Sequence, residues 1–219
     1  MFRSSGPRTR RLAAALGRRA ATPLDRRRAF DARERALFEP AAVVYTDTAD
    51  FTRRVRRHGI LHFLMAFSAA LPGLARAARR AGGVLVKVEA DSLLLRFPDA
   101  TRACRGVVEM EGALGAHSRR RPADERLRFS YGVGFGDVIV LEADLFGLEV
   151  NLASKLGEDV ARPGQVLLTP AAAAALDAAT RRRLLPHGIV ALAGRPLAVA
   201  RLPLPRAALT RRRSAAGVG

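Results

Sequence analysis

The chain has 219 residues, of which 49% are apolar and 26% are charged, as in a globular protein long enough to bury a core. A single cysteine, Cys104, excludes an internal disulfide, and no cluster of Cys and His residues has the spacing of a zinc site. The apolar part of residues 10–19 is too short for a signal peptide. These features predict a reducing, cytoplasmic setting.

Positive charge dominates the chain and is concentrated at its ends. The net charge is +18, with +7 in residues 1–40 and +5 in residues 201–219. Such segments are typical of a solvated tail, or of a contact with anionic membrane or an acidic partner. Of the 38 basic residues only two, Lys87 and Lys155, are lysines, and both fall in motifs described below.

The hydrophobic pattern predicts one short helix before residue 40 and alternating strands and helices after it. A buried strand over residues 41–46 precedes a helix over residues 51–80, which ends at the glycines after Ala81. The longest uncharged run in that helix, residues 59–75, is too short to span a membrane and indicates a buried helix. Two strands follow at residues 84–89 and 92–97, then a helix at 98–118, a glycine-rich strand or hairpin at 125–142 and a third helix at 146–161. A turn and strand at residues 162–169, a short alanine-rich helix and two weak strands at 187–192 and 196–202 complete the domain.

This order of elements predicts an α+β fold, with a ferredoxin-like, antiparallel-rich sheet and helices packed on one face. The chain is expected to divide into a basic extension over residues 1–40, a globular domain over residues 41–203, and a basic tail over residues 204–219.

Three motifs stand in order within the predicted domain. The first, "YTDTADFT", ends a strand in aspartate; the second, "GGVLVKVEAD", places a lysine and an aspartate around a hairpin; the third, "DLFGLEVNLASKL", leads into a helix. With the strand "RPGQVLLT" after them, they resemble the class III nucleotidyl cyclase catalytic domain. The resemblance covers roughly residues 41–169.

The resemblance implies that Asp47 and Asp91 hold two divalent cations, Mg²⁺ or Mn²⁺. Carboxylate oxygens are ligands that Mg²⁺ prefers. Two such ions about 3.5–4 Å apart suit the in-line attack of a ribose 3′-hydroxyl on an α-phosphate. The alternative is that Asp47 caps the following helix and Asp91 only forms a turn. Asp50, which stands where the family usually has glycine, is expected in the first turn of that helix and outside the site.

Lys87 and Asp144 are the base-recognition pair that the resemblance implies. In the adenylate-forming members a lysine donates to a ring nitrogen of adenine, and an aspartate accepts from the exocyclic amine. The guanylate-forming members tend to use Glu and Cys, which do not occur at these positions. The alternative is a lysine that lies along the surface and an aspartate that merely precedes a helix.

Asn151 and Lys155 lie four residues apart, so they share a face of the third helix. The resemblance implies that Asn151 orients the ribose and that Lys155, which replaces an arginine, stabilises charge on the phosphates as a point charge rather than a planar fork. Ser130 replaces the phosphate-binding arginine of the family. Arg128, two residues earlier and on the same strand face, is the predicted substitute. Ala90 replaces a glycine next to Asp91.

The sequence therefore predicts an adenylate cyclase that converts ATP to cyclic AMP and pyrophosphate. In the family, the metal aspartates come from one subunit and the remaining groups from the other, so the resemblance implies a homodimer. A second interpretation, motivated by Ser130 and Lys155, is a cyclase-homology domain that binds nucleotide or mediates dimerisation without turnover. A nucleic-acid-binding protein is disfavoured, because the chain has two tyrosines and no tryptophan for base stacking and its charge lies in the terminal segments.

Overall fold

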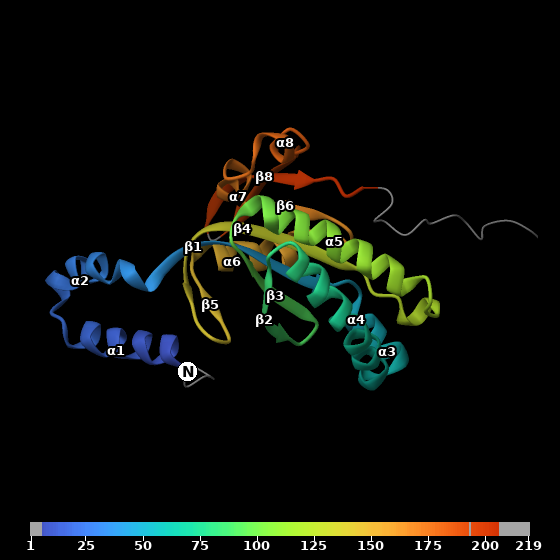
Figure 1. Cartoon of the computed structure of the whole chain (residues 1–219), viewed down its shortest axis with the longest axis horizontal. Helices are drawn as coiled ribbons and strands as arrows, with labels where there is room; N and C mark the ends of the chain where they lie inside the picture. Colours follow the sequence, from blue (N-terminus) through green and yellow to red (C-terminus); the bar gives the residue numbers. More distant parts are fainter. Residues whose placement is uncertain (1–5, 193, 206–219) are drawn as a thin grey trace, which may run out of the picture.

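The computed structural model describes residues 6–192 and 194–205, and these residues form one mixed β-sheet covered by helices (Figure 1). The strand order is β2-β3-β1-β4-β6-β8-β7, and the short strand β5 pairs with the end of β4. The pairing of β4 with β6 is parallel, and the other pairings are antiparallel. The strands are β1 Phe38–Thr48, β2 Val84–Glu89, β3 Ser92–Phe97, β4 Phe129–Val140, β5 Leu145–Phe146, β6 Val166–Leu168, β7 Leu185–Leu192 and β8 Arg195–Leu202.

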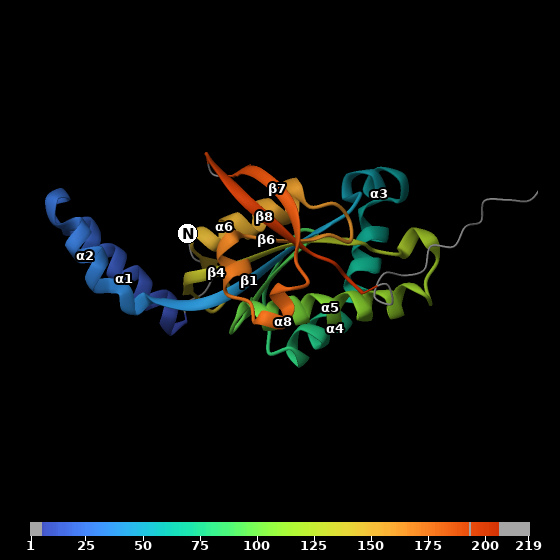
Figure 2. The same ribbon diagram turned by 90° about the horizontal axis from the view of Figure 1, so that it is seen from above.

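Helices lie on both faces of this sheet. The long helices α4 and α5 pack together on one face, and α6 crosses the opposite face (Figure 2). The bounds are α1 Pro7–Ala21, α2 Arg27–Arg33, α3 Phe51–His58, α4 Ile60–Arg80, α5 Ala100–Ser118, α6 Leu148–Lys155, α7 Pro170–Ala174 and α8 Ala178–Arg181. The predicted antiparallel-rich α+β fold is confirmed. The helices were predicted to pack on one face, but α6 also covers the opposite face, because the glycines of β4 let a helix lie close against it.

Strand β1 is buried on both faces, which explains its unbroken apolar run. Val44 belongs to the large core beneath α4 and α5. Val43, one residue earlier, belongs to a smaller core on the α6 side. Because successive side chains alternate between faces, Asp47 lies on the α6 side at the end of the same strand.

The glycines of the "YGVGFG" segment allow α6 to lie close against β4. A Cβ atom on Gly132 would lie 1.9 Å from the carbonyl oxygen of Ala153, and one on Gly134 would lie 2.5 Å from that of Glu149. Any side chain at these two positions would push the helix off the strand. Glu149 fastens the same contact, since its Oε2 accepts hydrogen bonds from the Phe135 main-chain N–H (3.1 Å) and from Thr169 Oγ1 (2.6 Å).

The predicted helix over residues 51–80 is two helices. Gly59 adopts φ 85°, which ends α3 and begins α4 in a new direction. The buried face of α4 packs in the main core, while Leu61 and Met65 near its start are exposed. Among the described residues, α4 is the one helix whose length and composition would suffice to cross a membrane, and 33% of its most apolar window is buried in this fold.

Residues 7–33 form a helical arm, α1 and α2, that projects from the end of the sheet opposite α3 (Figures 1 and 2). Two ion pairs within the N-terminal segment neutralise part of its positive charge, namely Arg18–Glu34 (2.8 Å) and Arg19–Asp31 (2.6 Å). The predicted helix at residues 10–19 is confirmed as part of α1. Most of the predicted C-terminal tail, residues 206–219, lies outside the described residues.

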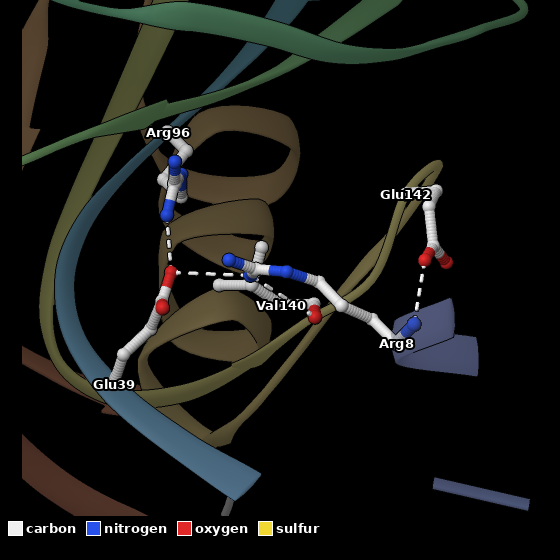
Figure 3. A network of polar contacts seen from close by, with 5 residues as sticks. All are labelled: Arg8, Glu39, Arg96, Val140 and Glu142. Carbon is white, nitrogen blue, oxygen red and sulfur yellow. Dashed lines mark hydrogen bonds and ion pairs between the residues drawn. The ribbon is translucent and has the colours of Figure 1, made fainter. Parts of the chain in front are cut away.

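The start of α1 is held by the turn between β4 and β5 (Figure 3). The Glu142 carboxylate accepts hydrogen bonds from the Arg8 main-chain N–H (2.6 Å), the Thr9 main-chain N–H (3.1 Å) and Thr9 Oγ1 (2.6 Å). Arg8 also pairs with Glu39 on β1 (3.5 Å), which in turn pairs with Arg96 on β3. These contacts satisfy N–H groups that a helix start leaves unpaired.

Candidate functional site

Asp47 and Asp91 meet at one end of the sheet. Asp47 is the penultimate residue of β1, and Asp91 occupies the turn between β2 and β3. Strand β3 pairs with β1 up to Thr46 and Leu93, so the turn lies beside the end of β1. Thr48 donates a hydrogen bond from Oγ1 to the main-chain carbonyl of Asp91 (2.7 Å) and fixes this contact. The fold thus brings together two aspartates that lie 44 residues apart in sequence.

The environment of the two carboxylates disfavours their negative charge. Burial raises the pKa of Asp47 to about 6, with further contributions from the negative charges of Asp91, Glu158 and Asp159. Burial also raises the pKa of Asp91, and Glu158 adds to the effect. Crowded, half-buried carboxylates are a common feature of functional sites.

This arrangement fits divalent cations. The side chains offer carboxylate oxygens from separate elements, which are the ligands that Mg²⁺ and Mn²⁺ use. A dication would offset the mutual repulsion that raises the pKa of Asp47. Asp47 and Asp91 are therefore the residues that would hold such ions.

Two residues beside these aspartates have left-handed backbone conformations. Asp50 has φ 66° and Ala90 has φ 51°, and they are the non-glycine residues with positive φ in the described part of the chain. They are also the two positions at which the cyclase motifs have glycine. The fold keeps the glycine-type backbone there although each residue carries a Cβ, at a cost of about 1–2 kcal/mol per residue. Asp50 precedes α3 at its N-cap position but makes no side-chain cap hydrogen bond.

Lys87 and Asp144 also come together. Lys87 Nζ lies 3.3 Å from Asp144 Oδ2 and 2.9 Å from Glu89 Oε2. Asp144 closes the turn that leads into β5, because its carbonyl accepts from the Leu141 N–H (2.9 Å) and its Oδ1 accepts from the Leu145 N–H (3.0 Å). The hydrogen bond to Glu89, and then that to Asp144, raise the pKa of Lys87. The pair that the sequence analysis assigned to base recognition is thus a real contact between β2 and the β4–β5 turn.

Asn151 and Lys155 lie on α6, as the sequence predicts. Asn151 is exposed, and Lys155 is half-buried with its Nζ 3.7 Å from Asp159 Oδ2. Residues Leu156–Val160 continue α6 as one π-helical turn, which carries Glu158 and Asp159 toward the carboxylate pair. The structure therefore places Lys155 next to an acidic residue of its own chain.

Ser130 and Arg128 occupy different surroundings. Ser130 is buried and donates a hydrogen bond from Oγ to the carbonyl of Gly157 (2.8 Å), so its side chain ties the π-helical turn to β4. Arg128 precedes β4 and lies half-exposed, with Nη2 3.4 Å from Asp50 Oδ2. Arg128 therefore reaches the loop that follows Asp47, whereas Ser130 faces the interior.

Sequence reasoning missed several polar groups of this site. Tyr45 lies on the same face of β1 as Asp47, and burial followed by the charge of Glu158 raises its pKa to about 12. Thr48 fixes the Asp91 turn. The "GED" letters after Lys155 were a usable signal for Glu158, since two acids at the end of a site helix suggest a charged contact.

No protein-family model matches the chain. An 87-residue stretch, 40% of the chain, is 33% identical to a protein of Rhizobium meliloti (strain 1021) named "Putative adenylate cyclase 3", and it spans 15% of that protein.

Solved structures of nucleotidyl cyclases are similar to about three quarters of the chain. An adenylate/guanylate cyclase/hydrolase from Silicibacter pomeroyi superposes with a TM-score of 0.62 at 24% identity, over 77% of this chain and 98% of the other. The catalytic core of a rhodopsin-guanylyl cyclase with converted specificity, in complex with ATPαS, gives 0.64 at 19% identity, over 75% and 94%. An adenylate cyclase from Trypanosoma brucei in its monomeric state gives 0.62 at 20% identity, over 80% and 92%. The chain therefore has the fold of class III adenylate/guanylate cyclase domains, as its three motifs predicted.

Proposed function

We propose that the chain is an adenylate cyclase that converts ATP to 3′,5′-cyclic AMP and pyrophosphate as a homodimer. The observation that carries the proposal is the meeting of Asp47 and Asp91 at the end of β1, three residues before α3 begins. A helix N-terminus offers unpaired N–H groups to phosphate oxygens. Two carboxylates beside such a terminus suit a triphosphate with its metal ions.

In the proposed reaction the ribose 3′-hydroxyl loses its proton to water and its oxygen bonds to the α-phosphorus. The bond to the pyrophosphate oxygen breaks, and pyrophosphate leaves with the electron pair. Two bound Mg²⁺ or Mn²⁺ ions would activate the 3′-hydroxyl and neutralise the phosphates. Asp47 and Asp91 would hold those ions. Asn151 is assigned to the ribose, Lys155 and Arg128 to phosphate charge, and Lys87 with Asp144 to the adenine.

The proposal requires two chains. Asp91 lies four positions after Lys87 in the β2–β3 hairpin, a span of at most about 13 Å of extended chain. Asn151 points into solvent and Lys155 contacts Asp159 of its own chain. In the proposal the metal pair of one chain therefore acts with the base pair, Asn151 and Lys155 of a second copy. The most direct support would be a titration in which activity rises with dimer concentration.

The first experiment is an assay of the purified protein with ATP and Mn²⁺ or Mg²⁺, in which both cyclic AMP and pyrophosphate are measured. Equal amounts of the two products are expected. Asp47→Asn and Asp91→Asn are expected to remove the activity. The control Asp137→Asn changes an exposed carboxylate of β4 and is expected to leave it intact. Absence of both products across metals and pH would refute the proposal.

A mixing experiment tests the shared site. Asp47→Asn and Asn151→Ala are each expected to be inactive alone. When the two variants are mixed, half of the dimers are mixed, and each of these contains one intact site. Recovery of about a quarter of the wild-type activity is expected from random pairing. No recovery, in a mixture shown to exchange subunits, would contradict the composite site.

A cyclase-homology domain that binds ATP without turnover is the second candidate. It is favoured by Ser130, which is buried and bonded to Gly157 where the motif has a phosphate-binding arginine. An arginine would not fit at this position without displacing α6, so Lys155→Arg is the sharper test. ATP binding with no product from either the wild type or this variant would support the second candidate.

The division into an extension, a domain over residues 41–203 and a tail remains a proposal. In this proposal the excess positive charge of the terminal segments attracts an anionic membrane or an acidic partner. A vesicle-binding assay with the chain shortened at either end tests it.

A further inference from the structure

A group of ligating side chains lies outside the cyclase site, at the junction of α3 and α4. His58 ends α3, His62 lies in the first turn of α4, and Asp124 belongs to the short 3₁₀ turn Ala123–Glu125 before β4. One ligand atom from each of the three residues lies within 4.8 Å of the other two. This junction is at the opposite end of the molecule from the α1–α2 arm (Figures 1 and 2).

The distances already approach those of metal coordination. His62 Nε2 lies 3.4 Å from Asp124 Oδ2. Ligand bonds of about 2.0–2.1 Å in a tetrahedral site separate neighbouring ligand atoms by about 3.3–3.5 Å. The imidazole rings of His58 and His62 are stacked, with centroids 5.1 Å apart and planes inclined by 30°. Small side-chain rotations would therefore bring the third ligand atom to the same distance.

The surroundings of His62 Nε2 also favour a bound ion. This atom is inaccessible to solvent and has no hydrogen-bond partner. A buried polar atom without a partner is costly and calls for an explanation, such as a bound ion. The atom is directed toward Asp124, which is the acidic member of the group.

Arg54 holds the backbone of the turn that carries Asp124. Its guanidinium donates hydrogen bonds to the main-chain carbonyls of Asp124 and Arg126, so it fixes the 3₁₀ turn against α3. Partners of this kind orient metal ligands. Its positive charge also opposes a cation, which limits the affinity of the site but leaves its geometry intact.

We propose that His58, His62 and Asp124 form a site for a transition-metal dication, with Zn²⁺ as the representative ion. Two imidazoles and one carboxylate are typical Zn²⁺ ligands, and a water molecule would complete the coordination. This ligand chemistry separates the site from Asp47 and Asp91, which offer oxygen alone and suit Mg²⁺. A bound ion would link the α3–α4 junction to the segment that leads into β4.

The test is the binding of Co²⁺ and Zn²⁺ to the full chain, produced without an oligohistidine tag, in buffer with excess Mg²⁺. Co²⁺ is expected to give the visible absorption of a nitrogen-coordinated site, and Zn²⁺ is expected to displace it at one equivalent per chain. His58→Ala and His62→Ala are each expected to weaken Co²⁺ binding at least about 100-fold. His58 is exposed, so its variant tests the proposal even if a variant at His62 does not fold.

His117→Ala is the matched control. His117 Nε2 is also buried without a partner, but its neighbours include Arg121 rather than a nearby pair of ligands. Its variant is expected to bind Co²⁺ as the wild type does. The double variant Asp47→Asn/Asp91→Asn is expected to keep the absorption as well. An unchanged spectrum in His58→Ala, or loss of the spectrum in the Asp47/Asp91 variant, would overturn the proposal without bearing on cyclase activity.

Discussion

Thr48 Oγ1 donates a hydrogen bond to the main-chain carbonyl of Asp91 over 2.7 Å, which joins the end of β1 to the β2–β3 turn. The two residues belong to elements that are far apart in sequence. Thr48 directly follows Asp47, and Asp91 is the other carboxylate of the pair. We therefore regard Thr48 as a positioning residue. Thr48 is buried, so the bond is shielded from water.

Thr48→Val should weaken metal binding without removing a ligand. Loss of the hydrogen bond leaves the Asp91 carbonyl unpaired and should lower the free energy of unfolding by about 1–2 kcal/mol. The affinity for Mn²⁺, measured by electron paramagnetic resonance, should fall about 10-fold or more. Thr48→Ser keeps the hydroxyl and should restore most of the affinity. Equal Mn²⁺ affinity in all three proteins would show that the bond does not position Asp91.

Asp47→Asn should stabilise the metal-free protein at neutral and alkaline pH. The pKa of Asp47 is about 6 in the folded protein against an ordinary value of 3.8, so the folded state binds more protons between these values. Stability therefore falls as the pH rises from about 4 to about 6, and the penalty persists above pH 6. After allowance for solvent screening it is on the order of 1 kcal/mol. Thermal unfolding in chelator should show a higher midpoint for the variant at pH 8, and equal midpoints near pH 4.

The same variant should lose the stabilisation that Mn²⁺ gives to the wild type. Asp137→Asn, an exposed carboxylate of β4, serves as the control and should retain it. A wild-type midpoint that does not respond to Mn²⁺ would argue against Asp47 as a metal ligand.

Lys87→Glu together with Asp144→Cys should change the preferred nucleotide from ATP toward GTP. The two side chains contact each other at 3.3 Å, so they are expected to act as one recognition unit and each single variant should mainly lose activity. The ratio of kcat/KM for GTP and ATP should change at least about 10-fold in the double variant. Lys155→Gln is the control, because it should lower kcat for both nucleotides without changing that ratio.

Glu142→Gln should loosen the α1–α2 arm. The carboxylate accepts three hydrogen bonds at the start of α1, led by that from the Thr9 hydroxyl, and these lower its pKa to about 2. A lowered pKa means that the contact contributes stability above pH 4.5 and loses it as the pH falls toward 2. At pH 7 trypsin should cut the variant faster within α1. Glu109→Gln, which breaks an ion pair with Arg80 on the α4–α5 layer, should leave that rate unchanged.

Ala90→Gly should stabilise the protein, since Ala90 holds φ 51° beside Asp91. Relief of the left-handed strain should raise the free energy of unfolding. The greater freedom of glycine in the unfolded chain offsets part of this gain, so the net increase should be about 0.5–1 kcal/mol. Ala69→Gly, at an exposed position within α4, should lower it by about 1 kcal/mol. Urea unfolding should show a higher free energy of unfolding for Ala90→Gly and a lower one for Ala69→Gly than for the wild type. A loss of stability at both positions would mean that Ala90 is not strained.

The sequence predicted most elements because their signals are local. Strands β2 and β3 were placed at their observed bounds. Helix α5 has a local start signal as well, since the Asp99 side chain accepts a hydrogen bond from the Arg102 N–H (2.7 Å). The break at Gly59 was missed, since one glycine within a long apolar pattern predicts a weak point rather than a change of direction. The interior position of Ser130 depends on how closely α6 approaches β4, which no local pattern encodes.

The candidate site divides in the same way. Asp47, Asp91, Lys87 and Asp144 were found through motifs, and the fold brings each pair together. Glu158 approaches Asp47 because of a π-helical turn. His58 and Asp124 come together although they lie 66 residues apart in sequence. Such contacts are properties of the tertiary structure.

The carboxylate that accepts from the first turn of α1 belongs to a residue 133 positions later in the chain. During synthesis the helix emerges first, but its acceptor exists only once the β4–β5 hairpin has been made and paired with β1. Helix α1 therefore reaches its final contacts only after the β4–β5 hairpin has formed. A peptide of the first 40 residues should be less helical alone than the same stretch in the finished chain.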